Sequence, residues 1–147
     1  MHTSKPSSAV DPRCTCLLLR QAARVVTQLY DEHLRPAGLR TSQFSLLANL
    51  RHDAGLSMGK LAARLTMDRT TLTRNLRPLT DAGWVASRPD PDDRRRTRLA
   101  LTPAGRVVLR AAVPRWREAQ RALRERVGDG TVLALHASID GTLEHLE

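Results

Sequence analysis

The chain has 147 residues, of which 41% are hydrophobic and 27% are charged, a composition typical of an ordinary globular domain. No apolar run approaches the ~20 residues needed to cross a bilayer, and residues 1–12 lack the apolar stretch of a signal peptide, so we expect a cytoplasmic protein without a membrane partner. The formal net charge of +9 favours a polyanionic partner such as nucleic acid.

The first part of the chain predicts a tail and two helices. Residues 1–10 are rich in Ser, Thr and Pro and have little to bury, so we interpret them as a disordered tail. Asp11 followed by a proline is typical of a helix start, and apolar residues then recur at helical spacing up to Leu34. An Arg-Pro-Ala-Gly sequence ends this helix, and a second helix is expected to begin near Thr41.

The middle of the chain predicts two short helices and a hairpin. Ser57 and Asp68 are typical helix caps, and the second of these helices turns three leucines inward: Leu72, Leu76 and Leu79. Residues 84–87 and 97–101 have the composition of strands, and the tip between them at 88–96 is rich in Pro, Asp and Arg.

Two long amphipathic helices are expected to complete the chain. Thr102 before a proline is typical of the start of a long helix, which Pro114 should bend, and Gly128 precedes the last helix. The apolar stripes of the terminal helices are too large for a small middle domain to cover, so we expect pairing with a second copy. The predicted fold is mainly α with a small β-hairpin wing: a winged helix-turn-helix at 41–102, with N- and C-terminal dimerisation helices at 11–40 and 103–147.

Two helices joined by a tight turn and followed by a basic hairpin form a winged helix-turn-helix, whose second helix enters the major groove of double-stranded DNA. Residues 57–110 hold 12 of the 24 Lys and Arg residues but 5 of the 15 acidic residues, so this stretch carries +7 of the net charge of +9. Arginine can bind a guanine edge through two hydrogen bonds, and hydroxyl groups can bind phosphate or base. The outward positions of the second helix are Arg69, Thr70, Thr73, Arg74 and Arg77, and their neighbours Thr71 and Asn75 join the candidate DNA-binding set.

Two stretches of the sequence resemble the MarR family of transcriptional regulators. The helix-turn-helix carries Leu61-Ala62, then Leu72-Thr73-Arg74-Asn75-Leu76, then Gly83-Trp84-Val85. The wing carries Asp93-Arg94-Arg95 followed by Leu-Ala-Leu-Thr-Pro-Ala-Gly at 99–105. The expected helix order matches the family from about Pro12 to Leu146.

This resemblance implies roles for the wing. Asp93 would hold Arg95 in place by a charge-assisted bond, and Arg95 would enter the minor groove, where a narrow A·T-rich sequence attracts arginine. Arg94 and Arg96 would lie near backbone phosphates. Two positions depart from the family pattern: Arg96 replaces a small residue, and Pro78 lies inside the recognition helix.

The resemblance also implies assembly and control. The protein would be a homodimeric repressor bound to a pseudo-palindromic operator, with half-sites about 34–36 Å apart, and it would need no cofactor. In this family small aromatic acids often bind between the dimerisation helices and the DNA-binding lobe. The candidate lining of such a ligand pocket is Arg20, Arg24, Tyr30, His33 and Trp116.

Cys14 and Cys16 have two interpretations. The region around Cys16 resembles the organic-hydroperoxide-sensing branch of the family, in which oxidation of a cysteine at this place releases DNA and a tyrosine at the place of Tyr30 helps to activate it. A second tyrosine of that branch is Arg20 here, which would favour the thiolate, as would the helix start. Alternatively, both cysteines pack as small apolar residues at the dimer interface. Residues two apart diverge on a helix, so we do not expect a Cys14–Cys16 disulfide, whereas a bridge between subunits stays open.

Two other classes of protein remain as alternatives. A small thiol enzyme would use Cys16, but the chain has no C-x-x-C motif and leaves the wing without a role. A non-specific nucleic-acid-binding protein would use the same basic surface without preferring one site by ~10³-fold. A metal site is not expected, because His33, His52, His136 and His145 lack ligand spacing.

Overall fold

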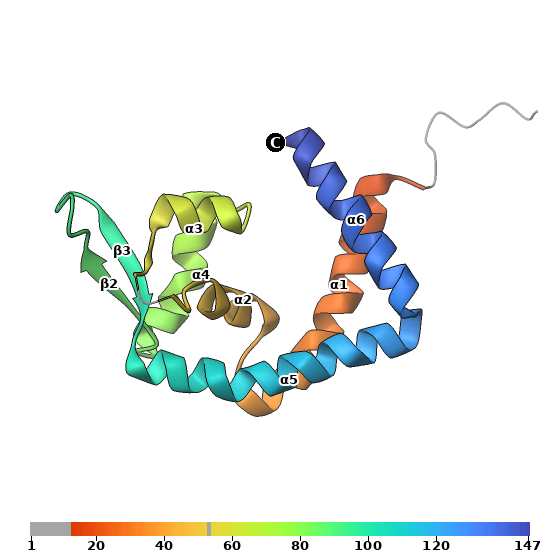
Figure 1. Ribbon diagram of the computed structural model, residues 1–147, viewed down its shortest axis with the longest axis horizontal. Coiled ribbons are helices and arrows are strands. Elements are labelled where there is room, and N and C mark those ends of the chain that lie inside the picture. Colours follow the sequence, from red (N-terminus) through yellow and green to blue (C-terminus); the bar gives the residue numbers. More distant parts are fainter. Residues whose placement is uncertain (1–12, 53) are drawn as a thin grey trace, which may run out of the picture.

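The computed structural model describes residues 13–52 and 54–147, and most of these are helical (Figure 1). The elements in chain order are α1 (Thr15–Leu34), η1 (Arg35–Ala37), α2 (Thr41–Asn49), β1 (Leu56–Ser57), α3 (Met58–Arg64), α4 (Arg69–Asp81), β2 (Val85–Pro89), β3 (Thr97–Leu101), α5 (Pro103–Val127) and α6 (Asp129–Leu146). The predicted fold class is confirmed, and the tail predicted at 1–10 lies outside the described residues.

The helix starts in the middle of the chain follow from local capping. The Ser57 hydroxyl accepts a hydrogen bond from the Lys60 amide at 3.2 Å, and a carboxylate oxygen of Asp68 accepts one from the Thr71 amide at 2.8 Å. The Thr102 hydroxyl caps α5 in the same way. The first helix starts later than expected, at Thr15, while the predicted Asp11 cap lies outside the described residues. Capping is a contact between near neighbours, which is why the sequence predicts it well.

The sheet has three antiparallel strands in the order β1-β3-β2. The hairpin of β2 and β3 was expected, and it pairs Val85 with Leu101 and Pro89 with Thr97. Strand β1 was not expected, because two residues are too short to show an alternating pattern. It pairs Leu56 with Leu99. This third strand attaches the loop after α2 to the base of the wing.

The core lies between α2, α3, α4, the sheet and the first half of α5. Its fully buried side chains are mostly leucines: Leu34, Leu46, Leu47, Leu50, Leu61, Leu72 and Leu79. Each such side chain contributes about 1.5–3 kcal/mol on burial, so this cluster fixes α4 firmly against the rest of the domain. Phe44 of α2 stacks on Trp116 of α5, with ring centroids 5.7 Å apart.

Helix α5 links two ends of the molecule (Figure 1). The winged helix-turn-helix lies at one end, and α1 and α6 lie at the other. Both α4 and α5 continue through an internal proline, Pro78 and Pro114. Among the described residues, no helix is long and apolar enough to cross a membrane.

The end of the molecule formed by α1 and α6 leaves large apolar side chains exposed. In α1 only Leu29 and Leu34 are buried, and in α6 only Val132 is. The exposed apolar residues of these two helices are Leu17, Leu18, Leu19, Val25, Leu133, Leu135, Ile139, Leu143 and Leu146. Large apolar side chains exposed in this number on two helices are typical of an interface.

Candidate nucleic-acid interface

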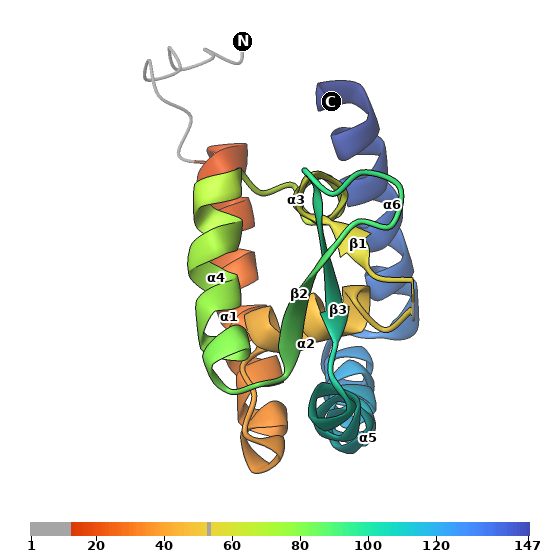
Figure 2. The same cartoon turned by 90° about the vertical axis from the view of Figure 1, so that its left-hand side faces the viewer.

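Helix α4 lies on the near side of the molecule in Figure 2, and it presents a polar, cationic face to solvent. Arg69, Thr70, Thr73, Arg74 and Arg77 are all exposed, while Leu72, Leu76 and Leu79 are buried behind them. The helical period therefore separates the two sets as the sequence predicts.

Two other predicted residues of α4 lie at the flank of this face and are engaged within the protein. The backbone N–H and the hydroxyl of Thr71 both donate to the Asp68 carboxylate, each at 2.8 Å. The amide of Asn75 lies 3.7 Å from the sulfur of Met67, in the turn before α4. Thr71 and Asn75 are half-buried, so the structure gives both of them a part in holding α4 in place.

The wing tip differs from the expectation in its internal bonding. Asp93 was expected to hold Arg95 in place by a charge-assisted bond, and its carboxylate accepts a hydrogen bond at 3.0 Å from the backbone N–H of Arg95 rather than from its guanidinium. The guanidinium that approaches Asp93 belongs to Arg96, with Nε 3.8 Å from the carboxylate. A carboxylate in a tight turn reaches the backbone two residues on more easily than a side chain, which explains the change of partner. The Arg95 side chain is left exposed at the tip, as is that of Arg94.

A groove runs between α4 and the sheet. One part has a volume of about 670 Å³, with Arg69, Arg74 and Arg77 among its lining residues and Leu99 on the sheet side. A second part of about 580 Å³ extends it toward the wing, where Arg95 and Arg96 line it. Arg69 lines both parts. Cationic side chains of the helix and of the wing therefore face a common concave surface.

Where the strands of the wing meet its tip lies an ion pair that the sequence alone does not single out. Arg98 Nε donates to a carboxylate oxygen of Asp90 at 3.1 Å, and both side chains are largely covered. These two residues are part of a run of charges at 88–98, and no local pattern distinguishes them from their neighbours.

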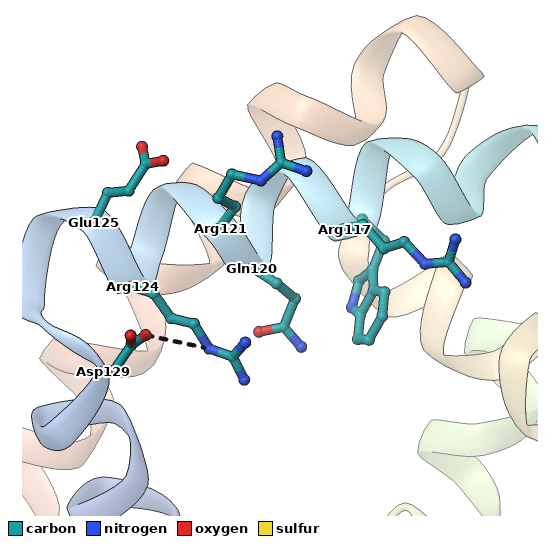
Figure 3. Close-up of a pocket in the computed structure, with 7 residues that line it drawn as sticks. Arg117, Gln120, Arg121, Arg124, Glu125 and Asp129 are labelled. Atoms are coloured by element: carbon teal, nitrogen blue, oxygen red, sulfur yellow. Dashed lines mark ion pairs between the residues drawn. The ribbon is translucent and has the colours of Figure 1, made fainter.

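A second concave surface lies along α5, with a volume of about 510 Å³ (Figure 3). Its lining residues are Trp116, Arg117, Gln120, Arg121, Arg124, Glu125 and Asp129. Gln120 and Arg124 project from the same side of α5, and Arg124 lies 4.0 Å from the Asp129 carboxylate (Figure 3). Arg117, Arg121 and Arg124 are four and three residues apart, so they lie near one another on one side of a helix. This spacing can be seen in the sequence.

Only part of the predicted ligand pocket lies at this surface. Trp116 lines it, and the Tyr30 hydroxyl donates to the side-chain oxygen of Gln120 at 2.6 Å, just behind it. Burial raises the pKa of Tyr30, and the charge of Arg124 partly offsets this. Arg20 and Arg24 are exposed on α1 and do not line it, nor does His33, which contacts the Leu29 carbonyl. Helix α1 contacts α5 through Tyr30, and Arg20 and Arg24 lie on other faces of α1.

The two cysteines lie at the very start of α1. Cys14 is the residue before the helix, with extended-type backbone angles (φ −57°, ψ 119°), and Cys16 is in the first turn. Both are exposed free thiols. The expected divergence of the pair assumed that both residues are helical, and Cys14 is not. In the described part of the chain, no three His, Cys, Asp or Glu side chains come together as a metal site.

Comparison with known proteins gives concordant matches. The model of the MarR family matches residues 39–97. The multiple antibiotic resistance protein MarR of Escherichia coli K12 is 33% identical over 81 residues, which is 55% of this chain and 56% of that protein. The matched region thus spans about half the length of this curated relative.

Solved structures match over more of the chain. The transcriptional regulator MosR of M. tuberculosis, in complex with DNA, is 40% identical, with 92% of this chain and 99% of that chain covered and a TM-score of 0.77. CouR of Rhodococcus jostii RHA1, bound to p-coumaroyl-CoA, is 25% identical, with 92% and 95% covered and a TM-score of 0.74. By their descriptions, the first is a transcriptional regulator in complex with DNA and the second binds p-coumaroyl-CoA.

Proposed function

This chain belongs to the MarR family, and on that premise we propose that it is a homodimeric, sequence-specific DNA-binding transcriptional regulator of the cytoplasm that acts as a repressor. The observation that carries the proposal is the groove between α4 and the wing, in which arginines of both elements face one concave surface. A charged helix face alone is common on protein surfaces. A cationic helix and a cationic hairpin that converge can contact adjoining grooves of one duplex.

Helix α4 would enter a major groove, which is wide enough to admit a helix, and Arg69, Arg74 and Thr70 would reach base edges or phosphates. The wing would then lie over the adjoining minor groove. Arg95 is the arginine whose side chain extends from the tip while its backbone is held by Asp93, so it would enter that groove. Arg94 and Arg96 would contact phosphates on either side.

The exposed apolar faces of α1 and α6 support a dimer. A second copy would cover the leucines and valines that this protomer leaves exposed, and a two-fold axis there would place two α4 helices side by side. Two recognition helices related in this way match a pseudo-palindromic operator with half-sites about 34–36 Å apart.

The direct test is to recover genomic fragments with the purified full-length protein and to sequence them. The proposal expects enrichment of one pseudo-palindromic motif. Fragments without a shared motif would instead support a non-specific nucleic-acid-binding protein. An Arg74→Ala protein serves as the matched control, because it keeps the fold and should lose enrichment of that motif.

For control of DNA binding we propose an anionic aromatic ligand at the concave surface along α5. Trp116 offers a ring to stack on, and Arg117 and Arg124 offer charge for a carboxylate. A ligand there would touch the helix that links the two ends of the molecule, so it can change the separation of the two recognition helices. Aromatic carboxylates should raise the melting temperature of wild-type protein more than that of Arg124→Gln and should release operator DNA. A panel that does neither would reject this site.

Exposure of Cys14 and Cys16 favours a second candidate, a thiol switch. Accessible thiols can be oxidised to sulfenic acid and then to a reversible disulfide, and these two lie at the start of α1, whose apolar residues are largely exposed. Here a hydroperoxide would release wild-type protein from DNA, a dithiol would restore binding, and Cys16→Ser would bind DNA but ignore peroxide. An identical response of both proteins would leave the ligand as the signal.

A further inference from the structure

Asp90 stands out as a buried charge in the middle of a cationic wing. It is 8% exposed, and it is the only charged or polar residue that is buried among the residues that the structure describes. It follows the last residue of β2, Pro89, and five arginines lie between residues 88 and 98. Burying a carboxylate costs free energy unless its oxygens are hydrogen-bonded, so its contacts indicate what it does.

Both carboxylate oxygens of Asp90 have a partner, and the two partners differ in kind. Oδ1 accepts a hydrogen bond from the backbone N–H of Asp92 at 2.9 Å, in the first part of the tip after β2. Oδ2 accepts one from Arg98 Nε at 3.1 Å, across the hairpin on β3. The Asp90 N–H in turn donates to the Arg96 carbonyl at 2.9 Å. The Asp92 N–H, followed by Arg98, lowers the pKa of Asp90, so the carboxylate is ionised at neutral pH.

Arg98 extends the connection beyond the wing. Its Nη1 donates to the carbonyl of Ala54 at 3.2 Å, in the loop between α2 and β1. That loop lies directly on β3: a Cβ added at Gly55, where φ is +67°, would be 2.6 Å from the Leu99 carbonyl oxygen. Arg98 therefore links the wing tip, its own strand and a loop of the helical core.

We propose that Asp90 and Arg98 form a brace that fixes the direction of the wing tip relative to α4. A two-stranded ribbon that projects into solvent is otherwise held only at its base, and its tip can swing. With the brace in place, Arg95 and Arg96 are presented toward the groove that they share with Arg69. Asp90 and Arg98 are thus positioning residues, and the inference rests on the proposed function, in which the wing contacts DNA.

If the brace positions the wing, removal of the Asp90 charge changes the affinity for DNA in the direction opposite to that expected from electrostatics alone. Removing a negative charge from a DNA-binding surface should strengthen binding to phosphate. The Asp90→Asn substitution should weaken it, because the new amide group would present an N–H group or a weaker acceptor to Arg98 and the tip would lose its direction. The chain offers a matched control in Asp92, which is exposed and contributes its backbone N–H to the brace.

The experiment measures the affinity of full-length wild type, Asp90→Asn, Asp92→Asn and Arg98→Lys for one selected operator at several salt concentrations. Loss of a charge-assisted bond predicts a roughly 10-fold weaker affinity for Asp90→Asn, whereas Asp92→Asn binds as tightly as wild type or more tightly. Arg98→Lys keeps the charge but cannot reach both Asp90 and Ala54, and it should weaken binding to a similar degree. In both weakened variants the slope of log affinity against log salt should be shallower, since fewer wing arginines engage DNA.

Equal or tighter binding by Asp90→Asn, with wild-type binding by Arg98→Lys, would overturn the brace. If Asp90→Asn fails to give a cooperative thermal melt, Arg98→Lys decides the question alone. Arg95→Ala separates this result from the proposed function: weak binding by Arg95→Ala with normal binding by both brace variants rejects the brace and leaves the wing's contact with DNA intact. Normal binding by Arg95→Ala as well would reject the role of the wing itself.

Discussion

Replacement of Arg95 by alanine tests the wing without disturbing the fold. The wing turn is held by the backbone N–H of Arg95, which alanine retains, and by the Asp93 carboxylate. The side chain is exposed, so its loss should change the free energy of unfolding by no more than about 0.5 kcal/mol. A change in affinity can therefore be assigned to the contact with DNA.

The expected loss of binding free energy follows from the contribution of one arginine and from the presence of two in a dimer. A well-placed arginine contributes about 1–3 kcal/mol to recognition, and a symmetric dimer uses two, so the loss should be about 2–6 kcal/mol. This corresponds to an affinity roughly 30-fold to 10⁴-fold weaker, with a shallower salt dependence. Fluorescence anisotropy on labelled operator at several salt concentrations measures both, and a thermal melt verifies the fold. An affinity within twofold of wild type, with an unchanged melt, would refute the placement of Arg95 in the minor groove.

Three further predictions follow from other parts of the molecule. Arg74→Ala should cost about 1–3 kcal/mol and relax the preference at one base position if Arg74 reads guanine; titration of single-base operator variants shows this, and equal losses on every variant would indicate a phosphate contact. Deletion of residues 131–147 should abolish the dimer in light scattering, because α6 supplies much of the exposed apolar face; a soluble dimeric truncation would contradict this. Asp68→Ala should lower the melting temperature, because its carboxylate caps α4. The hydrogen bond from the Thr71 backbone N–H lowers the pKa of Asp68 below its usual 3.8. This stabilisation is therefore complete above pH 3.8 and is lost as the pH falls through the lower folded-state pKa. A difference in melting temperature between wild type and Asp68→Ala that did not shrink in acid would count against the cap.

The sequence predicts the parts of this fold that depend on near neighbours. Caps such as Ser57 and Asp68, and the leucines that recur on one side of α4, are local patterns with a direct structural meaning. Strand β1 was missed, because its pairing with β3 joins segments more than forty residues apart and two residues carry no period.

In the candidate site, too, the residues that follow from a local pattern were predicted and those that depend on tertiary contacts were not. The exposed arginines of α4 follow from the helical period, whereas the partner of Asp93 depends on the conformation of the wing turn. The concave surface along α5 is lined by Arg117 and Arg124 and not by the predicted Arg20 and Arg24, because the side on which α1 packs against α5 is set by tertiary contacts. The pairing of Asp90 with Arg98 is likewise invisible in a run of charges, since only the hairpin brings the two together.

In the proposed function, the α4 and wing arginines recognise one DNA sequence rather than DNA in general. The most direct measurement is the affinity of the full-length protein for its selected operator and for a shuffled duplex of the same length and composition, both at one salt concentration near the physiological value. Sequence-specific recognition predicts a ratio of at least ~10³ in favour of the operator. A ratio near one, with both affinities falling steeply as salt rises, would contradict it and show that the basic groove binds phosphate alone.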